Sequence, residues 1–554
     1  MTLRKQKRFT VWSLITLLIM AFFVVFLLYP LVLVLYKSVV SPDTGGFSFT
    51  NFQKFFSRRY YWITLVNSFE VTILATVIST ALGLFMAYFT RSMKIFGQKT
   101  LEIATIIAFL SPPFIGAYAW IQLLGRQGVI TKVINSVFHV QMNGLYGFNG
   151  ILLVFTLQSF PLVYIYISGA LKTLDNSLNE AAESLGCTGI KRVVKVILPL
   201  IMPTVLASAL LIFMRIFADF GTPMLIGEGY KTVPVLIYNE FISEVGSDDG
   251  FAAALSVIVI VLTTIIFLVQ KLLSAHNSFS MSALKPMIPK RVRGFKNIIV
   301  HVAIYLLVIL AILPQIVVIY TSFLKNNGGQ VFTGGFSLQS YQSIFTEGQN
   351  SAIWNTYLFG LGAIAIILVM GTLISYVTIR KKNPLTSVLD VIAMFPYLVP
   401  GAVLGIAFTF AFSNRPFMIA GTAIIMIMSF AMRRMPYTIR SSTAILGQIS
   451  PSMEEAAVSL GCTDMQAFAK VTIPMMLPGI LSGAIMSWIT AISELSTSIL
   501  LYGDKTKTLT VAIYTSVVRG NYGNAAAYSS VLTITSILSL MLFFKFSGSR
   551  KVSI

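Results

Sequence analysis

The stretch Glu180-Ala181-Ala182-Glu183-Ser184-Leu185-Gly186-Cys187-Thr188 returns 275 positions later as Glu455-Ala456-Ala457-Val458-Ser459-Leu460-Gly461-Cys462-Thr463. The same offset continues to Leu198-Pro199, which matches Ile473-Pro474, and Asp219 matches Glu494. Pro112 and Pro400 match at an offset of 288, and the offset changes only where loops can absorb insertions. Self-similarity of this length indicates two copies of one structural unit in a single chain.

Composition places both copies in a membrane. Of the 554 residues, 56% are hydrophobic and 11% are charged, whereas charged residues make up about a quarter of a soluble domain. Apolar runs long enough to cross a bilayer recur throughout the chain, and a backbone in lipid must satisfy its own hydrogen bonds, so the runs are predicted to be helices. The predicted helices span 11–36, 63–90, 101–124, 149–171, 196–222, 252–270, 298–323, 354–379, 386–412, 417–439, 471–501 and 526–544. Prolines make 196–222 and 471–501 the spans where a break is expected.

The predicted fold class is therefore an all-α polytopic membrane protein with about twelve transmembrane helices in two six-helix repeats. Both copies of the repeated stretch fall between a fourth and a fifth span, on the same side of the membrane, so the repeats are parallel. The expected divisions are a first permease half over 1–275, a basic cytoplasmic linker over 276–297 and a second permease half over 298–554.

Charge placement predicts the orientation. The formal net charge is +21, but the lysines and arginines lie in short loops between apolar runs rather than in one basic block, which argues against a nucleic-acid partner. Basic residues concentrate in the loop after the second span, in the linker and in Arg380-Lys381-Lys382. The positive-inside rule then places these loops and both termini in the cytoplasm.

The repeated stretch resembles the EAA signature of the membrane subunits of binding-protein-dependent ABC importers. The resemblance implies the type I importer fold in a bacterial inner membrane, with membrane lipid around it. It also implies two copies of a separate ATPase subunit on the cytoplasmic side and a soluble or lipid-anchored substrate-binding protein outside. Carried over to this chain, the ATPase contact would be made by Glu180, Ala181, Ala182, Gly186, Glu455, Ala456, Ala457 and Gly461.

The residues of the two stretches fit that role. Glu180 to Leu185 and the matching segment are strong helix formers, and Gly186 and Gly461 are placed to end the two helices. Asn176 or Ser177 is expected to cap the first helix, and Ser450 or Ser452 the second. The alternative is an ordinary interfacial helix joining two spans, which would not explain duplication in register.

Charged residues inside a membrane are functional candidates. Asp219 and Glu494 lie late in the fifth span of each half and are expected to face each other across the pore, with Arg215 one turn earlier in position to neutralise Asp219. These three residues form the predicted substrate pathway. A structural ion pair or a place near the outer interface is an equally good interpretation. Tyr238 and Tyr514, in matched outer segments, are expected either to pack over the pore mouth or to anchor at the interface.

No catalytic or cofactor site is predicted. The chain has no glycine-rich phosphate loop ending in Lys-Ser/Thr, so ATP and magnesium are expected on the partner ATPase. His139, His276 and His301 stand far apart, and no metal site is expected.

The single-chain layout with two EAA segments resembles the fused permeases of ferric-iron importers, which makes ferric iron the first expected substrate. 2-Aminoethylphosphonate, thiamine, hexose phosphate and polyamine are the alternatives. An acidic pair suits a cation, whereas a phosphonate pore is expected to carry more Arg and Lys. The alternative class is a secondary transporter driven by an ion gradient, which has no need of EAA helices.

Overall fold

The computed structural model describes residues 10–41, 45–139, 141, 144–242, 248–276, 289–292, 294–326, 335–346 and 350–546. Within these ranges every regular element is a helix, and extended pairing is limited to three isolated bridges. Most of the predicted linker, residues 276–297, lies outside the described residues.

The elements of the first half share the apolar composition that predicted them. They are α1 (Val11–Phe23), η1 (Val24–Leu28), α2 (Tyr29–Ser38), α3 (Thr50–Ser57), α4 (Arg59–Ser92), α5 (Gln98–Leu110), α6 (Pro113–Leu124), α7 (Val129–Phe138), α8 (Gly147–Lys172), α9 (Asn176–Ser184), α10 (Gly189–Arg192), η2 (Val193–Ile197), α11 (Leu198–Phe217), α12 (Gly221–Ile226), α13 (Val233–Ile242) and α14 (Asp249–His276).

The second half repeats this order, with a shorter connection before its fourth span. Its elements are α15 (Phe295–Ser322), α16 (Gln339–Thr346), α17 (Ser351–Arg380), α18 (Pro384–Leu398), α19 (Gly401–Phe412), α20 (Ala423–Leu446), α21 (Ser452–Ser459), α22 (Asp464–Ala467), η3 (Phe468–Thr472), α23 (Ile473–Ile492), α24 (Ser498–Leu501), α25 (Leu509–Val518) and α26 (Tyr522–Phe546).

Nine helices of the described chain are long and apolar enough to cross a membrane, and eleven if each of two bent pairs counts as one span. The remaining predicted span corresponds to α20. This helix carries Arg433, Arg434 and Arg440, which lower its apolar character. It packs on α17 and α23 as α8 packs on α4 and α11, so by position it is the fourth span of the second half.

The third span of each half is broken, although the sequence predicted it as continuous. The α5–α6 pair bends by 100° and the α18–α19 pair by 109°. Pro112 and Pro400 stand at the two breaks, and Ser111 and Val399, the residues before them, adopt extended backbone. Proline disfavours helical backbone in the preceding residue and has no N–H to donate, which explains the position of both bends.

The expected break at the prolines of the fifth spans is wrong. The helical segments Gly189–Phe217 and Asp464–Ile492 continue through these prolines. A π-helical turn precedes Pro199 and Pro474 in each half, and the N–H of the residue before the proline bonds to a carbonyl five positions back. This wider turn accommodates the missing proline donor, and the spans instead end at Phe217 and Ile492.

The first helix of each half packs against the other half. α1 contacts α17 and α18, and α2 contacts α19, while α15 contacts α5, α6 and α8. Trp12 of α1 lies with its ring centroid 4.5 Å from that of Tyr376 and 5.2 Å from that of Phe468. The two large hydrophobic clusters of the described chain therefore each contain residues from both halves.

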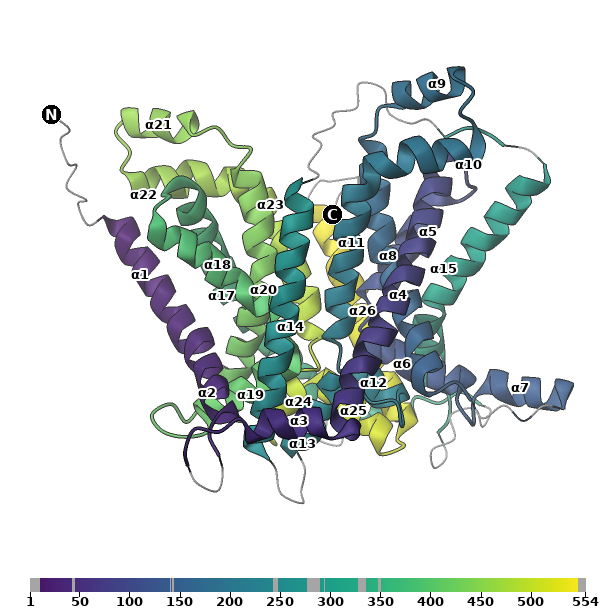
Figure 1. Cartoon of the computed structure of the whole chain (residues 1–554), viewed down its shortest axis with the longest axis horizontal. Coiled ribbons are helices and arrows are strands. Elements are labelled where there is room, and N and C mark those ends of the chain that lie inside the picture. Colours follow the sequence, from purple (N-terminus) through teal and green to yellow (C-terminus); the bar gives the residue numbers. More distant parts are fainter. Residues whose placement is uncertain are drawn as a thin grey trace.

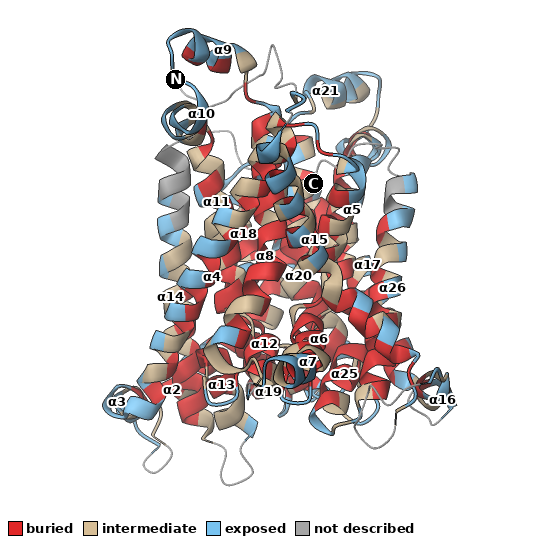
Figure 2. Ribbon diagram, turned by 90° about the vertical axis from the view of Figure 1, so that its right-hand side faces the viewer, coloured by how far each residue is buried: buried red, intermediate tan, exposed pale blue. Residues whose placement is uncertain are grey.

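The arrangement has two distinct ends (Figure 1). α9 and α21 lie at one end on separate arms, α13 and α25 lie at the other, and the helices diverge toward the end with α9 and α21. α1 begins and α26 ends at that same end. Buried residues concentrate in the middle of the helices, whereas α9, α21 and their loops are largely exposed (Figure 2).

Candidate functional site

The two EAA helices end in the same way. Gly186 and Gly461 have positive φ, 75° and 94°, which glycine adopts without steric cost. Gly186 N donates to the Glu183 carbonyl at 3.0 Å, and Cys187 N donates to the Ala182 carbonyl at 2.8 Å. The second copy repeats both bonds at equivalent positions, at 2.9 and 3.1 Å. This pair of bonds is the Schellman motif, so the predicted role of both glycines in ending the helices is confirmed.

The helix starts differ from the prediction. Asp175 caps α9, because its carboxylate accepts from Ser177 N at 2.9 Å; neither Asn176 nor Ser177 is the cap. In α21 the capping position is Pro451, whose side chain accepts no hydrogen bond. The Ser450 hydroxyl accepts from Ser452 N at 3.4 Å just before it.

Both EAA helices expose matched apolar side chains. Leu185 is 87% exposed and Leu460 is 88% exposed. Glu180, Ala181, Glu455 and Ala456 are also exposed, and Ala457 is half-buried. Ala182 is buried against its own half, so it does not reach the surface where a partner was predicted to touch it. The two copies therefore leave the leucine at the end of each EAA helix equally exposed.

The second EAA helix is joined to a membrane-spanning helix by a half-buried ion pair. Glu454 Oε1 lies 3.1 Å from Arg380 Nε at the end of α17, and Tyr376 donates to Glu454 Oε2 at 2.9 Å. The first helix has Asn179 at the matching place, and its Oδ1 is buried without a hydrogen-bond partner among the described residues. The two arms are therefore attached unequally.

A central cavity of about 480 Å³ lies between the halves. The bends after α5 and α18 form part of its wall, and the fourth and fifth spans form the rest. The polar residues of the wall are Ser111, Tyr166, Arg215, Asp219, Tyr397, Arg433, Arg434, Tyr437, Ser441, Ser482, Thr490, Ser493, Glu494 and Ser496. The predicted pathway residues Asp219, Glu494 and Arg215 thus lie on one cavity wall.

Asp219 and Glu494 occupy equivalent breaks in the chain, just after the fifth span of each half. Asp219 Oδ1 accepts from Thr222 N at 2.9 Å, and Glu494 Oε1 accepts from Thr497 N at 3.2 Å. Each carboxylate therefore satisfies a backbone donor at the start of the short helix that follows, α12 or α24. The local role is the same in both halves, but the charge partners differ.

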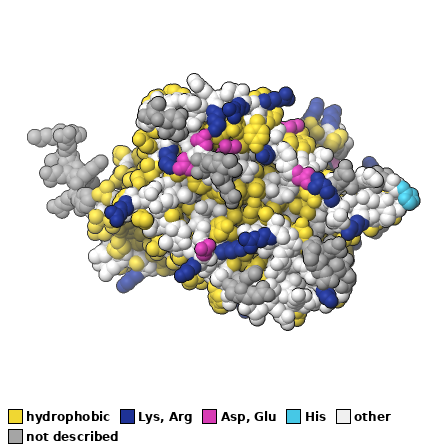
Figure 3. All heavy atoms as spheres, turned by 90° about the horizontal axis from the view of Figure 1, so that it is seen from below, with side chains coloured by type: hydrophobic (Ala, Val, Ile, Leu, Met, Phe, Trp, Pro, Cys, Tyr) yellow, Lys and Arg dark blue, Asp and Glu magenta, His cyan; other side chains and the backbone are white. Residues whose placement is uncertain are grey.

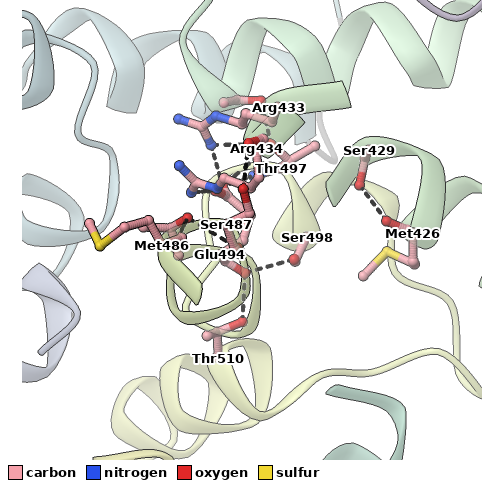
Figure 4. Close-up of polar contacts among 12 residues, drawn as sticks. Met426, Ser429, Arg433, Arg434, Met486, Ser487, Glu494, Thr497, Ser498 and Thr510 are labelled. Atoms are coloured by element: carbon pink, nitrogen blue, oxygen red, sulfur yellow. Dashed lines mark hydrogen bonds and ion pairs between the residues drawn. The ribbon is translucent and has the colours of Figure 1, made fainter. Parts of the chain in front are cut away.

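Glu494 holds two arginines (Figure 4). Its Oε1 forms an ion pair with Arg433 Nη1 and its Oε2 forms one with Arg434 Nη2, while the Glu494 side chain is only 2% exposed. Arg433 Nη1 also donates to Thr497 Oγ1 at 3.4 Å. Gly401 gives this cluster its space, because a Cβ there would lie 2.6 Å from Ser496 Cβ.

Arg215 and Asp219 line the same cavity but do not touch directly. Among the described residues no ion pair joins the two, and no hydrogen bond reaches the Arg215 guanidinium. The Arg215 guanidinium instead lies 4.7 Å from the centre of the Phe109 ring, a cation–π contact.

Sequence analysis missed Arg433 and Arg434. A search for matched positions cannot find them, because the first half has Gln158 and Ser159 at the same register. The available signal was two adjacent arginines inside the apolar run 417–439. The wall thus carries three arginines beside its two carboxylates, and a pore suited to a cation stays a prediction.

Three aromatic rings from the two halves lie together beside Asp219 and Gly221 of the cavity wall. Phe220 is buried, and its ring centroid lies 4.8 Å from that of Tyr238 and 6.4 Å from that of Tyr514. Both tyrosines therefore pack against the same ring, while their placement over a pore mouth, like an anchoring role at the interface, stays a prediction. On the face beyond them, basic and acidic side chains lie interspersed (Figure 3), and Lys37–Asp249 and Lys54–Asp248 form ion pairs of 2.8 and 2.7 Å.

Comparison with known proteins places the chain in a family. The model of the family described as binding-protein-dependent transport system inner membrane component matches residues 79–278 and 367–550. The ferric transport system permease protein FbpB of Actinobacillus pleuropneumoniae is 28% identical over 97% of this chain and 78% of its own length. The putative 2-aminoethylphosphonate transport system permease protein PhnU of Salmonella typhimurium is 26% identical over 48% of this chain and 92% of its own length.

Among solved structures, a bacterial ABC transporter involved in the import of the acidic polysaccharide alginate has 16% sequence identity and a TM-score of 0.40, covering 48% of this chain and 96% of that one. The family match covers most of this chain and occurs twice, once in each half. The chain therefore belongs to the inner membrane components of binding-protein-dependent transport systems, as a non-catalytic, multi-pass permease subunit that carries two copies of the family domain.

Proposed function

We propose that this chain forms the translocation pathway of an ATP-driven importer of ferric iron. Two copies of an ATPase subunit dock on α9 and α21, one on each arm, and bind ATP and magnesium. A substrate-binding protein docks at the end that carries α13 and α25. The central cavity is the path that the substrate takes between them.

The observation that carries the proposal is the pair of exposed EAA helices. They stand at one end of the molecule, end in the same Schellman motif and each present a leucine that the chain itself leaves uncovered. Covering a leucine side chain is worth about 1.5–3 kcal/mol, so two exposed and matched leucines favour a duplicated partner. Glu180, Ala181, Glu455 and Ala456 border them, and Gly186 and Gly461 hold the leucines in place.

Charge supports a cytoplasmic position for this end. Arg380, Lys381 and Lys382 follow one another at the end of α17, near α21, and the segment from Lys271 to Lys296 contains basic residues but no acidic one. Under the positive-inside rule both termini are then cytoplasmic. The helices diverge on that side of the molecule.

Support for ferric iron comes from the relatives. The permease of Actinobacillus pleuropneumoniae matches nearly the whole chain, whereas the 2-aminoethylphosphonate permease matches half of it. Fused halves over the full length favour the iron assignment. Transport of ferric iron has to be compared with transport of the alternative substrates, which are 2-aminoethylphosphonate, thiamine, hexose phosphate and polyamine.

The docking role is tested by the double substitution Leu185→Glu with Leu460→Glu. Neither leucine is covered within the chain, so membrane insertion and thermal stability are expected to stay unchanged while co-purification of the ATPase is lost. Phe336→Glu is the matched control, since Phe336 is 77% exposed but precedes α16, far along the chain from both EAA helices. Full retention of the ATPase by the double variant would contradict the docking role.

Transport is tested in proteoliposomes that contain the chain, its ATPase and its binding protein. Uptake of ferric iron is expected to require ATP on the side of the membrane where the ATPase subunits lie. It is not expected to depend on a proton or sodium gradient. Uptake that follows an ion gradient without ATP would identify a secondary transporter instead. Uptake of another of the named substrates in place of iron would refute the iron assignment alone.

A further inference from the structure

We propose that the central cavity is itself a binding site for an anionic ligand that presents carboxylate, phosphate or phosphonate oxygens, held by Arg215, Arg433 and Arg434. The proposal rests on the proposed function in one respect, that the cavity is the substrate path. It adds the chemical class of what the path accepts.

The charge of the wall is the first argument. Three guanidinium groups and two carboxylates line the cavity, which leaves an excess of one positive charge. Glu494 is shared between Arg433 and Arg434, so these two cations are only partly compensated. A cation entering the cavity would meet this excess, whereas an anion would complete the charge balance.

The donors that remain free are the second argument. Arg215 has neither an ion pair nor a hydrogen bond to any described residue. The Arg434 Nε is buried and lacks a partner among the described residues. The Arg215 guanidinium, which contacts the Phe109 ring, thus keeps its N–H donors available, and a planar guanidinium fits carboxylate and phosphate oxygens in pairs.

Three tyrosines extend the set of donors. Tyr166, Tyr397 and Tyr437 line the same cavity, and the ring centroids of the last two lie 5.9 Å apart. None of the three hydroxyls has a hydrogen-bond partner among the described residues. Hydroxyl donors beside guanidinium groups form a wall that can surround an oxygen-rich anion on several sides.

The third argument is that the cluster breaks the internal symmetry. Arg215 matches Thr490, while Arg433 and Arg434 match Gln158 and Ser159. Each half therefore builds the same helices with uncharged residues at the positions where the other half has arginine. Because the fold does not require these arginines, their convergence on one cavity points to a ligand.

Two sources share this ligand chemistry. A ferric ion would enter as a complex whose outer oxygens belong to an anionic chelator such as citrate. A phosphonate or inorganic phosphate would enter by itself. Both present oxygens to the same guanidinium groups, and the experiment has to separate them.

The potential of the cavity is measured with a cysteine at Thr490, in a chain whose Cys187 and Cys462 are replaced by serine. Thr490 lines the cavity at the position that matches Arg215. The full transporter in membrane vesicles is treated with two thiosulfonate reagents that modify cysteine. One carries an anionic sulfonate group and the other a cationic trimethylammonium group. The anionic reagent is expected to react faster after correction for the rates with a free thiol.

Variants of the wall then shift the rate ratio in opposite directions. Arg215→Gln is expected to lower the ratio of the anionic to the cationic reaction rate about tenfold, because it removes one positive charge close to the cysteine in a site of intermediate dielectric constant. Asp219→Asn is expected to raise the ratio. Arg126→Gln, which removes an exposed arginine that pairs with Glu228, is expected to leave the ratio unchanged.

Ligand binding is measured as protection of the Thr490 cysteine. Ferric citrate, 2-aminoethylphosphonate and inorganic phosphate are the anionic probes, and thiamine and spermidine are the cationic ones. Saturable protection by an anion, lost in Arg215→Gln, is expected, and the anion that protects best identifies the source.

Faster reaction of the cationic reagent, protection by cations alone, or failure of both reagents to reach the cysteine at Thr490 would overturn the inference. Each of these results is compatible with intact ATP-driven uptake. Loss of ATP dependence with an anion-selective cavity would overturn the proposed function instead.

Discussion

The ion-pair cluster at Glu494 allows a sharp test, because the internal repeat supplies its own control. Glu494→Gln removes the carboxylate that two buried guanidinium groups share, and Arg433 and Arg434 then stay in the cavity wall without their partner. Breaking a buried ion pair by removing one member costs about 3–5 kcal/mol. The backbone bond from Thr497 can survive, because the amide oxygen still accepts it.

The matched substitution is Asp219→Asn. Asp219 has no ion pair to any described residue, and its one hydrogen bond from Thr222 N can be kept by the asparagine oxygen. Replacing a charged acceptor with a neutral one at this site costs about 1 kcal/mol. The two variants are therefore expected to differ by about 2–4 kcal/mol, although they change the same kind of atom at equivalent places.

Thermal unfolding of the purified transporter in detergent measures the difference. Glu494→Gln is expected to lower the midpoint by several degrees and Asp219→Asn by little. A second variant, Glu494→Gln combined with Arg434→Gln, is expected to recover part of the loss because it removes one uncompensated charge. Equal midpoints for the two single variants would refute the view that Glu494 is the structural partner of both arginines.

Two further predictions concern glycines. Gly186→Ala and Gly461→Ala place a Cβ in open space, but the left-handed backbone at these positions costs about 1–2 kcal/mol for a residue other than glycine. Both variants are therefore expected to show faster hydrogen–deuterium exchange in α9 and α21. Unchanged exchange would contradict the Schellman assignment. Gly83→Ala places a Cβ 2.6 Å from Val163 Cβ at the α4–α8 contact and is expected to lower stability by about 1–3 kcal/mol. Gly169→Ala, with no atom within 4 Å of the new Cβ, is the control and is expected to leave the melting midpoint nearly unchanged.

Features with a local cause were predictable from the sequence. The spans follow from apolar runs, and the ends of α9 and α21 follow from Gly186 and Gly461, because a helix that needs a left-handed residue selects glycine. The repeat also brought Asp219 and Glu494 to equivalent places. In each case the residues that decide the structure lie within a few positions of one another.

Features with several local solutions, or with a long-range cause, were not predictable. Prolines occur in both the third and the fifth spans, but only Pro112 and Pro400 bend the chain sharply, since π-helical turns carry the fifth spans past their prolines. Arg433 and Arg434 have no counterpart in the first half, so symmetry hid them. The packing of Trp12 against Tyr376 joins residues that no pattern in either segment connects.

The exchange of first helices between the halves sets an order on biosynthesis. α1 begins at Val11, but α17, against which it packs, begins at Ser351. A chain inserted from its N-terminus leaves α1 surrounded by lipid until the later helices arrive, and α15 then completes the earlier half. Covalent fusion keeps the early helix near its late partner at a high effective concentration, so assembly does not depend on two separately made proteins meeting in the bilayer.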